Sequence, residues 1–307
     1  MKIFATADIH GNKALIYLIR EVIQKEEIDI LIIAGDIAPK GLYQLYKSGL
    51  RYDMRSVFRL TNRENILEGS EQQIRVNLDL LGFIEIPEDS YNLSLLKLRQ
   101  KEALCRICEL LKTLGIPVYL LIGNDDHISD NDWDKILRDY GICSLNLRAY
   151  ELEEFKMVGF QYILPTPWNT NNELSENSIV DKLASIESHM DRETIFISHG
   201  PPKDILDRTA NGLCVGSESI YSFVKEKQPT FHIFGHIHEA FGSIKIDRTI
   251  FYNAACLWDD WFLRGYIIDT KTRSEKKVER KITLREFNVI YEEYLSTLQH
   301  ERRLGDW

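Results

Sequence analysis

The first 34 residues alternate between two apolar runs and a helical pattern, and this alternation restricts the chain to a fold with parallel strands. Residues 3–7 and 28–34 are short apolar runs, whereas apolar residues recur at helical spacing between Leu15 and Ile23. Two buried strands joined by a helix form a β-α-β unit, whose strands pair in parallel. Polar residues directly after such strands face the crevice at the carboxyl edge of the sheet. These positions are occupied here by Asp8, His10 and Asp36.

Later segments extend this pattern into a larger sheet system. Expected strands first alternate with helices, and in the last third of the chain they are separated by short turns. This order predicts an α/β fold in which a mixed β-sandwich is flanked by helices. The further expected strands cover residues 118–122, 157–160, 194–198, 231–234, 243–246, 250–253 and 266–268.

The segments outside this pattern suggest one domain over residues 1–307 with two additions. Residues 40–114 lack strong strand signals and predict a helical insertion or cap, with helices near 42–60, 70–82 and 92–114. Residues 275–307 predict a helical extension at the carboxyl terminus. Its apolar positions from Leu284 to Leu298 repeat at helical spacing, which indicates a helix docked on its own core or, alternatively, a contact in a homodimer.

The overall composition restricts the classes of partner and the cellular compartment that we expect for this protein. The chain has 47 acidic and 38 basic residues, a formal charge of −9, which argues against generic attraction to nucleic acid or to an anionic membrane. No apolar run reaches membrane-spanning length, and the amino-terminal run is too short for a secretory signal. Its five cysteines are read as reduced thiols. We therefore expect a cytoplasmic protein with no membrane partner.

Five separate segments place His, Asp or Asn at the ends of expected strands, and five of the eight histidines lie in them. A single histidine after a strand is more often a hydrogen-bonded structural residue, but five such segments together are hard to explain in that way. Carboxylates and imidazoles suit Mn, Fe, Zn or Ni, and two adjacent divalent cations need such a set. The segments are Asp8 to His10, Gly35-Asp36, Gly123 to His127, Ser198 to Pro202 and Gly235 to His238.

The order D-x-H, G-D, G-N-x-D, H-G and G-H-x-H resembles the signature of the calcineurin-like metallophosphoesterases, most of all their cyclic-nucleotide-phosphodiesterase-like microbial branch. The resemblance implies two divalent metal ions and hydrolysis of a phosphodiester or phosphomonoester in a small substrate, by a hydroxide that bridges the metals. It assigns Asp8, His10 and His238 to one metal, Asn124, His199 and His236 to the other, and Asp36 to a bridge. A nuclease of the same superfamily and a non-catalytic metal-binding scaffold of the same fold stay open as alternatives.

Position 125 departs from this family pattern. Most members have a histidine there, near the leaving-group oxygen, whereas this chain has Asp125. Two metals nearby should keep Asp125 ionised, so we expect either that the metals act alone or that His127 assists the leaving group.

Two further features are candidates for substrate binding. Lys47, Arg51, Arg55, Arg59 and Arg63 recur every four residues, which on a helix would form a cationic stripe. This stripe is either a solvated face or a surface that binds substrate phosphate or an acidic partner, with Arg51, Arg55 and Arg59 as the candidate residues. Asn12 is either the cap of the first helix or a substrate contact.

Overall fold

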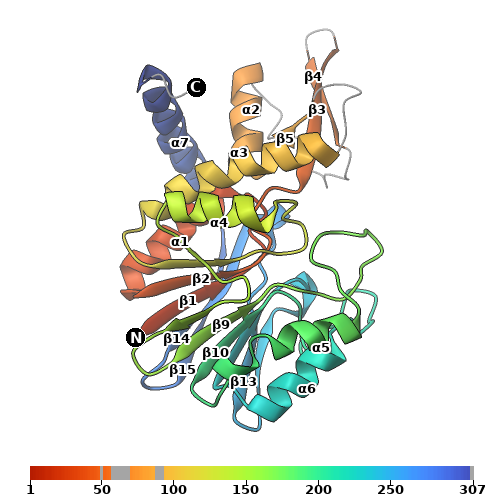
Figure 1. The fold of residues 1–307 in the computed structure, drawn as a ribbon. Helices are drawn as coiled ribbons and strands as arrows, with labels where there is room; N and C mark the ends of the chain where they lie inside the picture. Colours follow the sequence, from red (N-terminus) through yellow and green to blue (C-terminus); the bar gives the residue numbers. More distant parts are fainter. Residues whose placement is uncertain (49–50, 57–69, 87–92, 305–307) are drawn as a thin grey trace.

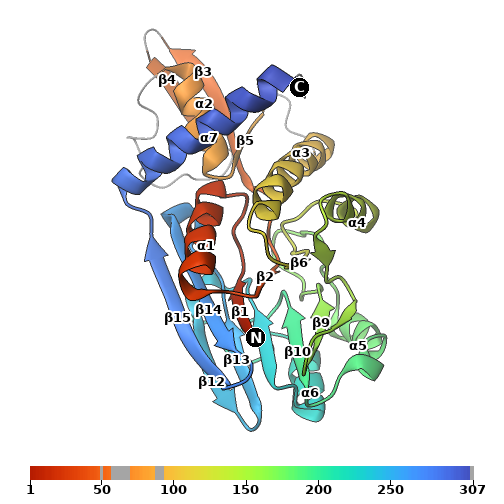
Figure 2. The same ribbon diagram turned by 90° about the vertical axis from the view of Figure 1, so that its left-hand side faces the viewer.

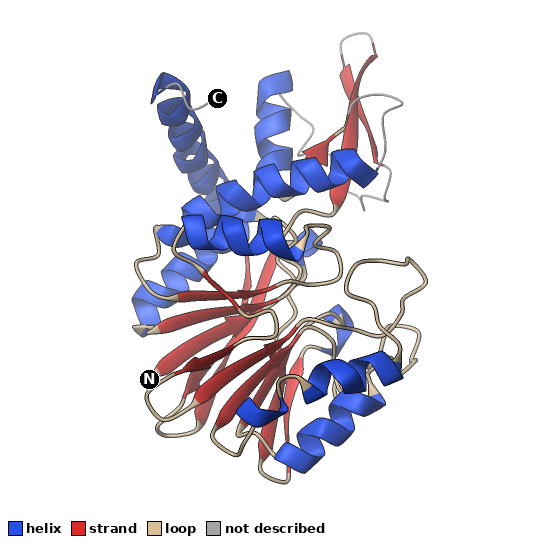
Figure 3. Ribbon diagram, viewed as in Figure 1, coloured by secondary structure: helices blue, strands red, loops and turns tan. Residues whose placement is uncertain are grey.

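The computed structural model describes residues 1–48, 51–56, 70–86 and 93–304 (Figure 1). Two six-stranded sheets face one another, and helices cover both outer sides (Figure 3). The first sheet has the order β15-β14-β1-β2-β6-β7 and the second β12-β13-β11-β10-β9-β8. This arrangement confirms the predicted mixed sandwich flanked by helices.

The strands of the first sheet are β1 (Lys2–Thr6), β2 (Ile30–Ala34), β6 (Val118–Leu121), β7 (Cys143–Ser144), β14 (Phe262–Asp269) and β15 (Ser274–Lys281). Those of the second sheet are β8 (Ala149–Glu151), β9 (Lys156–Phe160), β10 (Thr194–Ser198), β11 (Phe231–Phe234), β12 (Gly242–Ile246) and β13 (Thr249–Asn253). The described helices are α1 (Lys13–Glu26), α2 (Glu71–Leu80), α3 (Leu93–Lys112), α4 (Asp130–Asp139), α5 (Glu176–Ala184), α6 (Glu218–Lys227) and α7 (Leu284–Leu304).

The centre of each sheet is parallel, as the β-α-β pattern predicts. β1 pairs in parallel with β2, and β2 pairs in parallel with β6. In the second sheet β10 lies between β9 and β11, again in parallel with both. The carboxyl ends of these central strands therefore share one edge within each sheet.

Alternating side chains build the layers on either side of the first sheet. In β2, Ile30 and Ile32 point into the core between the two sheets, whereas Leu31 and Ile33 pack against the helices outside. The second sheet repeats the arrangement, since Ile195 of β10 lies between the sheets and the next residue in the strand packs against α5 and α6. Continuous apolar strands are what a sheet covered on both faces requires.

The insertion between β2 and β6 is not all helical. Helices α2 and α3 confirm two of its three predicted helices, but the prediction of a helix near residues 42–60 is wrong. Residues Gly41–Ser48 and Arg51–Ser56 form strands β3 and β4, paired antiparallel, and β5 (Phe83–Glu85) extends them into a three-stranded sheet. Tyrosines at 43, 46 and 52 favour strand, and this preference outweighed the four-residue spacing of the basic residues.

The carboxyl-terminal extension also differs from its prediction at its beginning. A helical extension from residue 275 is wrong for β15, which pairs with β14 along its whole length. Helix α7 begins only at Leu284, and that side chain is exposed rather than part of the docked face. The docked-helix interpretation is confirmed by Phe287, Ile290 and Tyr294, which are buried in the core around α1. Figures 1 and 2 show α7 and the insertion together at one end of the sandwich.

Among the described residues, no helix combines the length and the apolar character that crossing a bilayer would require.

Candidate metal centre

The predicted ligands converge because they follow strands of both sheets. Asp8 and His10 lie just beyond β1, Asp36 beyond β2 and Asn124 beyond β6, all in the first sheet. The second sheet contributes His199 after β10, and His236 and His238 after β11. These residues form two groups, and within each group the ligand atoms lie within 4.8 Å of one another. The first group is Asp8, His10 and His238, and the second is Asp36, His199 and His236.

The backbone bends sharply at the ligands themselves. Four of them have positive φ angles, namely Asp8 (58°), His10 (42°), Asp36 (53°) and His236 (68°). Non-glycine residues rarely adopt this left-handed conformation, which costs about 1 kcal/mol or more at each position. Asp and His adopt this conformation more often than other non-glycine residues, but it remains costly, so surrounding contacts must hold the four turns in place.

Asp36 is the residue that connects the two groups. Its Oδ1 lies 3.4 Å from Nε2 of His199, and its Oδ2 lies 3.5 Å from Nε2 of His10. The carboxylate is almost fully buried, and Oδ1 also accepts a hydrogen bond from the backbone N–H of Asp125 at 2.9 Å. One oxygen therefore faces each group, which is the placement that a bridging carboxylate needs.

His199 is oriented so that one ring nitrogen faces the site. Its Nδ1 lies 2.9 Å from the carbonyl oxygen of Ala34, which can only accept, so Nδ1 carries the proton and donates. Its Nε2 lies 2.9 Å from Oδ1 of Asn124. With no cation bound, a proton on Nε2 lets His199 donate to this amide oxygen, which can only accept. The separation also suits two ligands of one cation with bonds of about 2.1 Å.

A loop before α5 fixes the amide of Asn124. The hydroxyl of Thr170 donates to Oε1 of Glu173 at 2.5 Å, so its oxygen accepts from Nδ2 of Asn124 at 2.9 Å. This chain of hydrogen bonds turns Oδ1 of Asn124 toward His199. The sequence carries no local signal for it, because the residues of the loop that contact Asn124 lie 46 or more positions further along the chain.

His10, in the group with Asp8 and His238, also indicates a metal site. It is fully buried, yet neither of its ring nitrogens has a hydrogen-bond partner among the described residues. A buried imidazole without a partner costs free energy, whereas a cation at Nε2 or Nδ1 would remove that cost. The donor set of carboxylates, imidazoles and one amide suits a borderline divalent metal. The residues present thus fit a metal pair.

The glycines before the ligands are required by close packing. A β-carbon at Gly123 would lie 2.1 Å from Oδ1 of Asp36, and one at Gly235 would lie 2.2 Å from Oδ2 of Asp8. Any other residue would push a ligand carboxylate away from its place.

The electrostatics of the centre favour positive charge. Burial lowers the pKa of His199, but Asp36 and Asp8 outweigh it and raise that pKa to about 10. Burial, together with nearby Lys40, holds the pKa of His10 well below its usual value. Burial also lowers the pKa of His236 to about 3. The centre therefore keeps His10 and His236 neutral and stabilises a cation beside the two carboxylates.

Asp125 lies at this centre, but its partner was not foreseen. Its carboxylate Oδ2 accepts from Nζ of Lys40 at 3.0 Å, and the carboxylate also belongs to a group of nearby ligand atoms with His10 and Asp36. Burial raises the pKa of Asp125, but Lys40 and the histidines lower it below its usual value. This shift favours the ionised form that the sequence analysis expects, and a lysine contributes to it in addition to any metal.

Gln100 of α3 joins the loops that carry these residues. Its fully buried Nε2 donates to the carbonyl oxygens of Pro39 and Asp125, both at 2.8 Å, and its Oε1 accepts from the backbone N–H of His127 at 2.7 Å. Gln100 was missed because nothing near it in sequence distinguishes it from any other polar helix residue. His127 is half-buried, its backbone contact is with Gln100, and its proposed role with the leaving group stays a prediction.

Asp126 was also missed, although it belongs to a predicted motif. Its buried carboxylate accepts from the backbone N–H groups of Ile37, Ala38 and Gly123 at 2.6–3.2 Å. It therefore ties the loop after β2 to the loop after β6. Its place in the motif after Gly123 was evident from the sequence, but its partners were not.

The remaining candidates are the residues predicted to bind substrate. Asn12 caps α1, since its Oδ1 accepts from the backbone N–H of Leu15 at 3.3 Å, and its Nδ2 donates to the carbonyl oxygen of Trp258 at 2.7 Å. Its side chain is fully buried, which favours the capping alternative, and the substrate contact stays a prediction. Arg51 and Arg55 lie on β4 rather than on a helix, and Arg59 falls outside the described residues. Substrate binding by these arginines stays a prediction.

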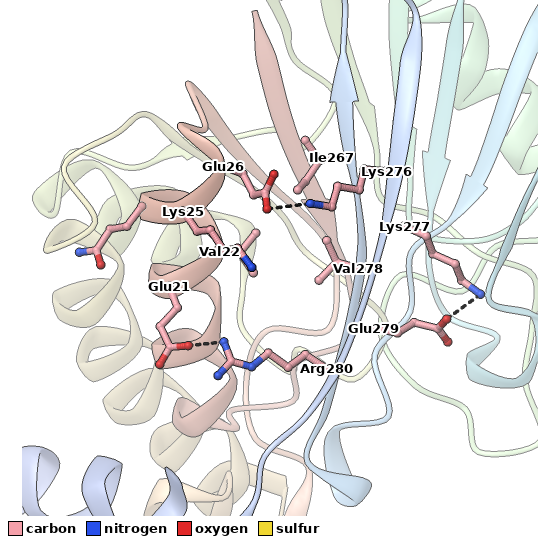
Figure 4. A pocket seen from close by; sticks show the side chains of 11 residues that line it. Glu21, Val22, Lys25, Glu26, Ile267, Lys276, Lys277, Val278, Glu279 and Arg280 are labelled. Carbon is pink, nitrogen blue, oxygen red and sulfur yellow. Dashed lines mark hydrogen bonds and ion pairs between the residues drawn. The ribbon is translucent and has the colours of Figure 1, made fainter.

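A hollow of about 570 Å³ lies between α1 and the edge of the first sheet, apart from the metal centre. Its charged side chains already pair with one another, as Glu26 does with Lys276 at 2.8 Å and Lys277 with Glu279 at 2.9 Å (Figure 4). None of the predicted ligands lines it.

Comparison with known proteins agrees with this geometry. A model of the family described as calcineurin-like phosphoesterase matches residues 1–240. The chain is 30% identical over 130 residues to the uncharacterised protein MJ1162 of Methanocaldococcus jannaschii, a match that covers 40% of this chain and 59% of that protein. The chain thus spans less than two thirds of the length of the curated relatives it matches.

Solved structures share the fold at low sequence identity. One crystal structure superimposes with a TM-score of 0.62 at 16% identity, over 91% of this chain and 98% of that chain. The protein TT1561 of Thermus thermophilus superimposes with a TM-score of 0.51 at 9% identity, also over 91% and 98%. These likenesses bear on the architecture alone.

Proposed function

The chain belongs to the calcineurin-like phosphoesterase family, and on that premise we propose that it is a two-metal-dependent hydrolase of phosphodiesters or phosphomonoesters. The observation that carries the proposal is the position of Asp36, with one oxygen toward His10 and the other toward His199.

In this proposal each group of ligands holds one divalent cation, of Mn, Fe, Zn or Ni. Asp8, His10 and His238 would hold the first, Asn124, His199 and His236 would hold the second, and Asp36 would lie between them. When bound, such a pair acidifies a water molecule and neutralises charge on the phosphoryl group. The cost of the repulsion between two cations is offset by the shared carboxylate.

The chain's own residues orient these ligands. The Ala34 carbonyl sets the tautomer of His199, and the Thr170 hydroxyl sets the direction of the Asn124 amide. The carboxylate of Asp8 accepts from the backbone N–H of His236 at 3.0 Å, which connects the two groups across the sheets. Such hydrogen bonds to ligands typically contribute tenfold to a hundredfold in metal affinity or activity.

The substrate that we propose is a small phosphorylated molecule. The formal charge of −9 supports this choice over a polymeric nucleic acid, whose binding depends on cationic surface. His236, His238 and Asp125 are half-buried while Asp8, His10 and His199 are fully buried, so the former three mark the side from which a substrate enters.

The test is a screen of metals against substrates on protein stripped with a chelator. Mn, Fe, Zn and Ni would be added back singly, with aryl phosphodiesters, aryl phosphomonoesters, cyclic nucleotides and short oligonucleotides as substrates. We expect hydrolysis of a small ester that disappears with chelation and returns with metal. Two bound metals per chain with no hydrolysis in any combination would instead support a non-catalytic scaffold, and turnover of oligonucleotides alone would support a nuclease.

A further inference from the structure

A lysine ammonium lies at the edge of the metal centre with donors to spare. Lys40 follows Asp36 by four residues, and its Nζ has one hydrogen-bond partner among the described residues, Oδ2 of Asp125 at 3.0 Å. An ammonium group has three donors, so two remain for a ligand. The side chain of Lys40 is 37% exposed and that of Asp125 is 19% exposed, so the pair is reachable from outside.

The position of this pair relative to the metals is fixed by the ligand groups. A carboxylate oxygen of Asp125 lies within 4.8 Å of ligand atoms of both His10 and Asp36. The ammonium of Lys40 is one hydrogen bond further out. Lys40 is close enough to His10 and Asp36 to influence both electrostatically, so it can also attract the oxygens of a phosphate at this centre.

The pair is also held firmly from behind. Gln100 donates hydrogen bonds to two carbonyl oxygens. One belongs to Pro39, which precedes Lys40, and the other to Asp125, which pairs with Lys40. Three backbone N–H groups, two of them from Ile37 and Ala38, bind the carboxylate of Asp126. The loops that carry Lys40 and Asp125 therefore move as one unit, and the ammonium is preorganised for an anion.

An isolated Asp125 would be an obstacle at such a site, because an ionised carboxylate repels an anionic substrate. Lys40 removes this difficulty, since it neutralises the carboxylate and leaves donors pointing to a ligand. A solvated surface lysine would need neither a buried clamp behind it nor a partner beside the metal ligands.

We propose that Lys40 is a phosphate-binding residue of the centre and that Asp125 is its positioning residue. The ammonium donates a hydrogen bond to an oxygen of the phosphoryl group while the metals hold the others. The inference rests on the proposed function, and it defines which residue replaces the histidine that the sequence lacks at position 125.

The experiment measures binding of inorganic phosphate to metal-loaded protein by titration calorimetry, together with metal content and steady-state kinetics. Lys40→Met should weaken phosphate binding at least tenfold and raise KM more than it lowers kcat, with metal content unchanged. Lys40→Arg should recover part of the affinity. Lys276→Met is the matched control, because Lys276 forms a similar ion pair with Glu26 in the distant hollow, and it should leave phosphate binding unchanged.

A double-mutant cycle tests the positioning role. If Asp125 orients Lys40, the effect of Lys40→Met on phosphate binding should shrink severalfold in an Asp125→Asn background. Additive effects would overturn the role of Asp125, and equal phosphate affinity of wild type and Lys40→Met would overturn the whole inference. Phosphate binding that depends on Lys40 in a protein that hydrolyses no ester would leave the inference standing and reject the proposed function.

Discussion

Gly82 packs directly on the backbone of His10, so that a β-carbon at position 82 would lie 2.4 Å from the carbonyl oxygen of His10. Gly82 follows α2 in the insertion, and its φ of 82° is open to glycine but strained for other residues. The insertion thus supports the bend that carries the first two ligands, and the metal centre is not built by the sandwich alone.

Gly82→Ala should therefore unfold more easily and bind metal more weakly. Gly212→Ala is the control, because Gly212 has a φ of 80° but nothing within 4 Å of an added β-carbon. The control should lose about 1 kcal/mol from backbone strain, and Gly82→Ala should lose several kcal/mol because backbone atoms must move. Urea unfolding of both variants checks this. Equal losses would mean that the close packing of Gly82 on His10 is unimportant.

Asp36→Asn should greatly weaken metal binding and hydrolysis. An amide cannot offset the charge of two cations, and its nitrogen would turn a donor toward one group of ligands. Metal analysis after dialysis should find fewer than two ions per chain, with turnover reduced at least a hundredfold. Two retained ions with normal turnover would rule out the bridging role.

Asp79→Asn should be strongly destabilising, because Asp79 is the charged partner of the fully buried Lys13 at 2.9 Å. The same carboxylate accepts from the hydroxyl of Tyr294 on α7. An unpaired buried ammonium typically costs about 3–5 kcal/mol. Glu293→Gln, which breaks an exposed pair between α7 and Arg20, should cost less than about 1 kcal/mol. Similar unfolding free energies for the two variants in urea would contradict this.

His232 should make stability fall as the pH falls. It is buried among aromatic rings, and burial lowers its pKa to about 3. Below about pH 6.5 the unfolded chain binds a proton at this residue and the folded chain does not. The free energy of unfolding therefore decreases as the pH falls.

The slope of unfolding free energy against pH between 6 and 4 should therefore be smaller in His232→Phe, by about 1.4 kcal/mol per pH unit. Urea unfolding in the presence of chelator measures the slope for both proteins without a contribution from metal binding. Parallel slopes would show that His232 is protonated in the folded state or titrates normally.

The sandwich and the ligand segments could be predicted because both are local. An apolar run such as Leu31 to Ala34 predicts a buried strand, and the residue after it predicts the crevice. The hairpin of β3 and β4 could not be predicted, because basic residues at every fourth position have the spacing of a helical face. Strand β15 was missed for a related reason: as an edge strand with polar residues on both sides, it lacks the alternation that identifies strands.

The contacts that support the site could not be predicted from the sequence, for a different reason. Gln100 and Thr170 act on loops 25 or more residues away, and their roles exist only once the sheets bring those loops together. Lys40 lay close to a predicted ligand, but its meaning depends on Asp125, which lies 85 residues further along the chain.

The three hydrogen bonds of Gln100 limit whether the insertion can be deleted from this protein or exchanged with that of a relative. Residues 40–114 resemble an accessory that could be deleted to give a minimal sandwich, or exchanged for the equivalent segment of a relative. Deletion would leave two carbonyl oxygens and one N–H buried without partners beside the ligands. An exchange would succeed only if the incoming segment brought an amide to the same point. The insertion and the catalytic core are therefore expected to tolerate substitution only together.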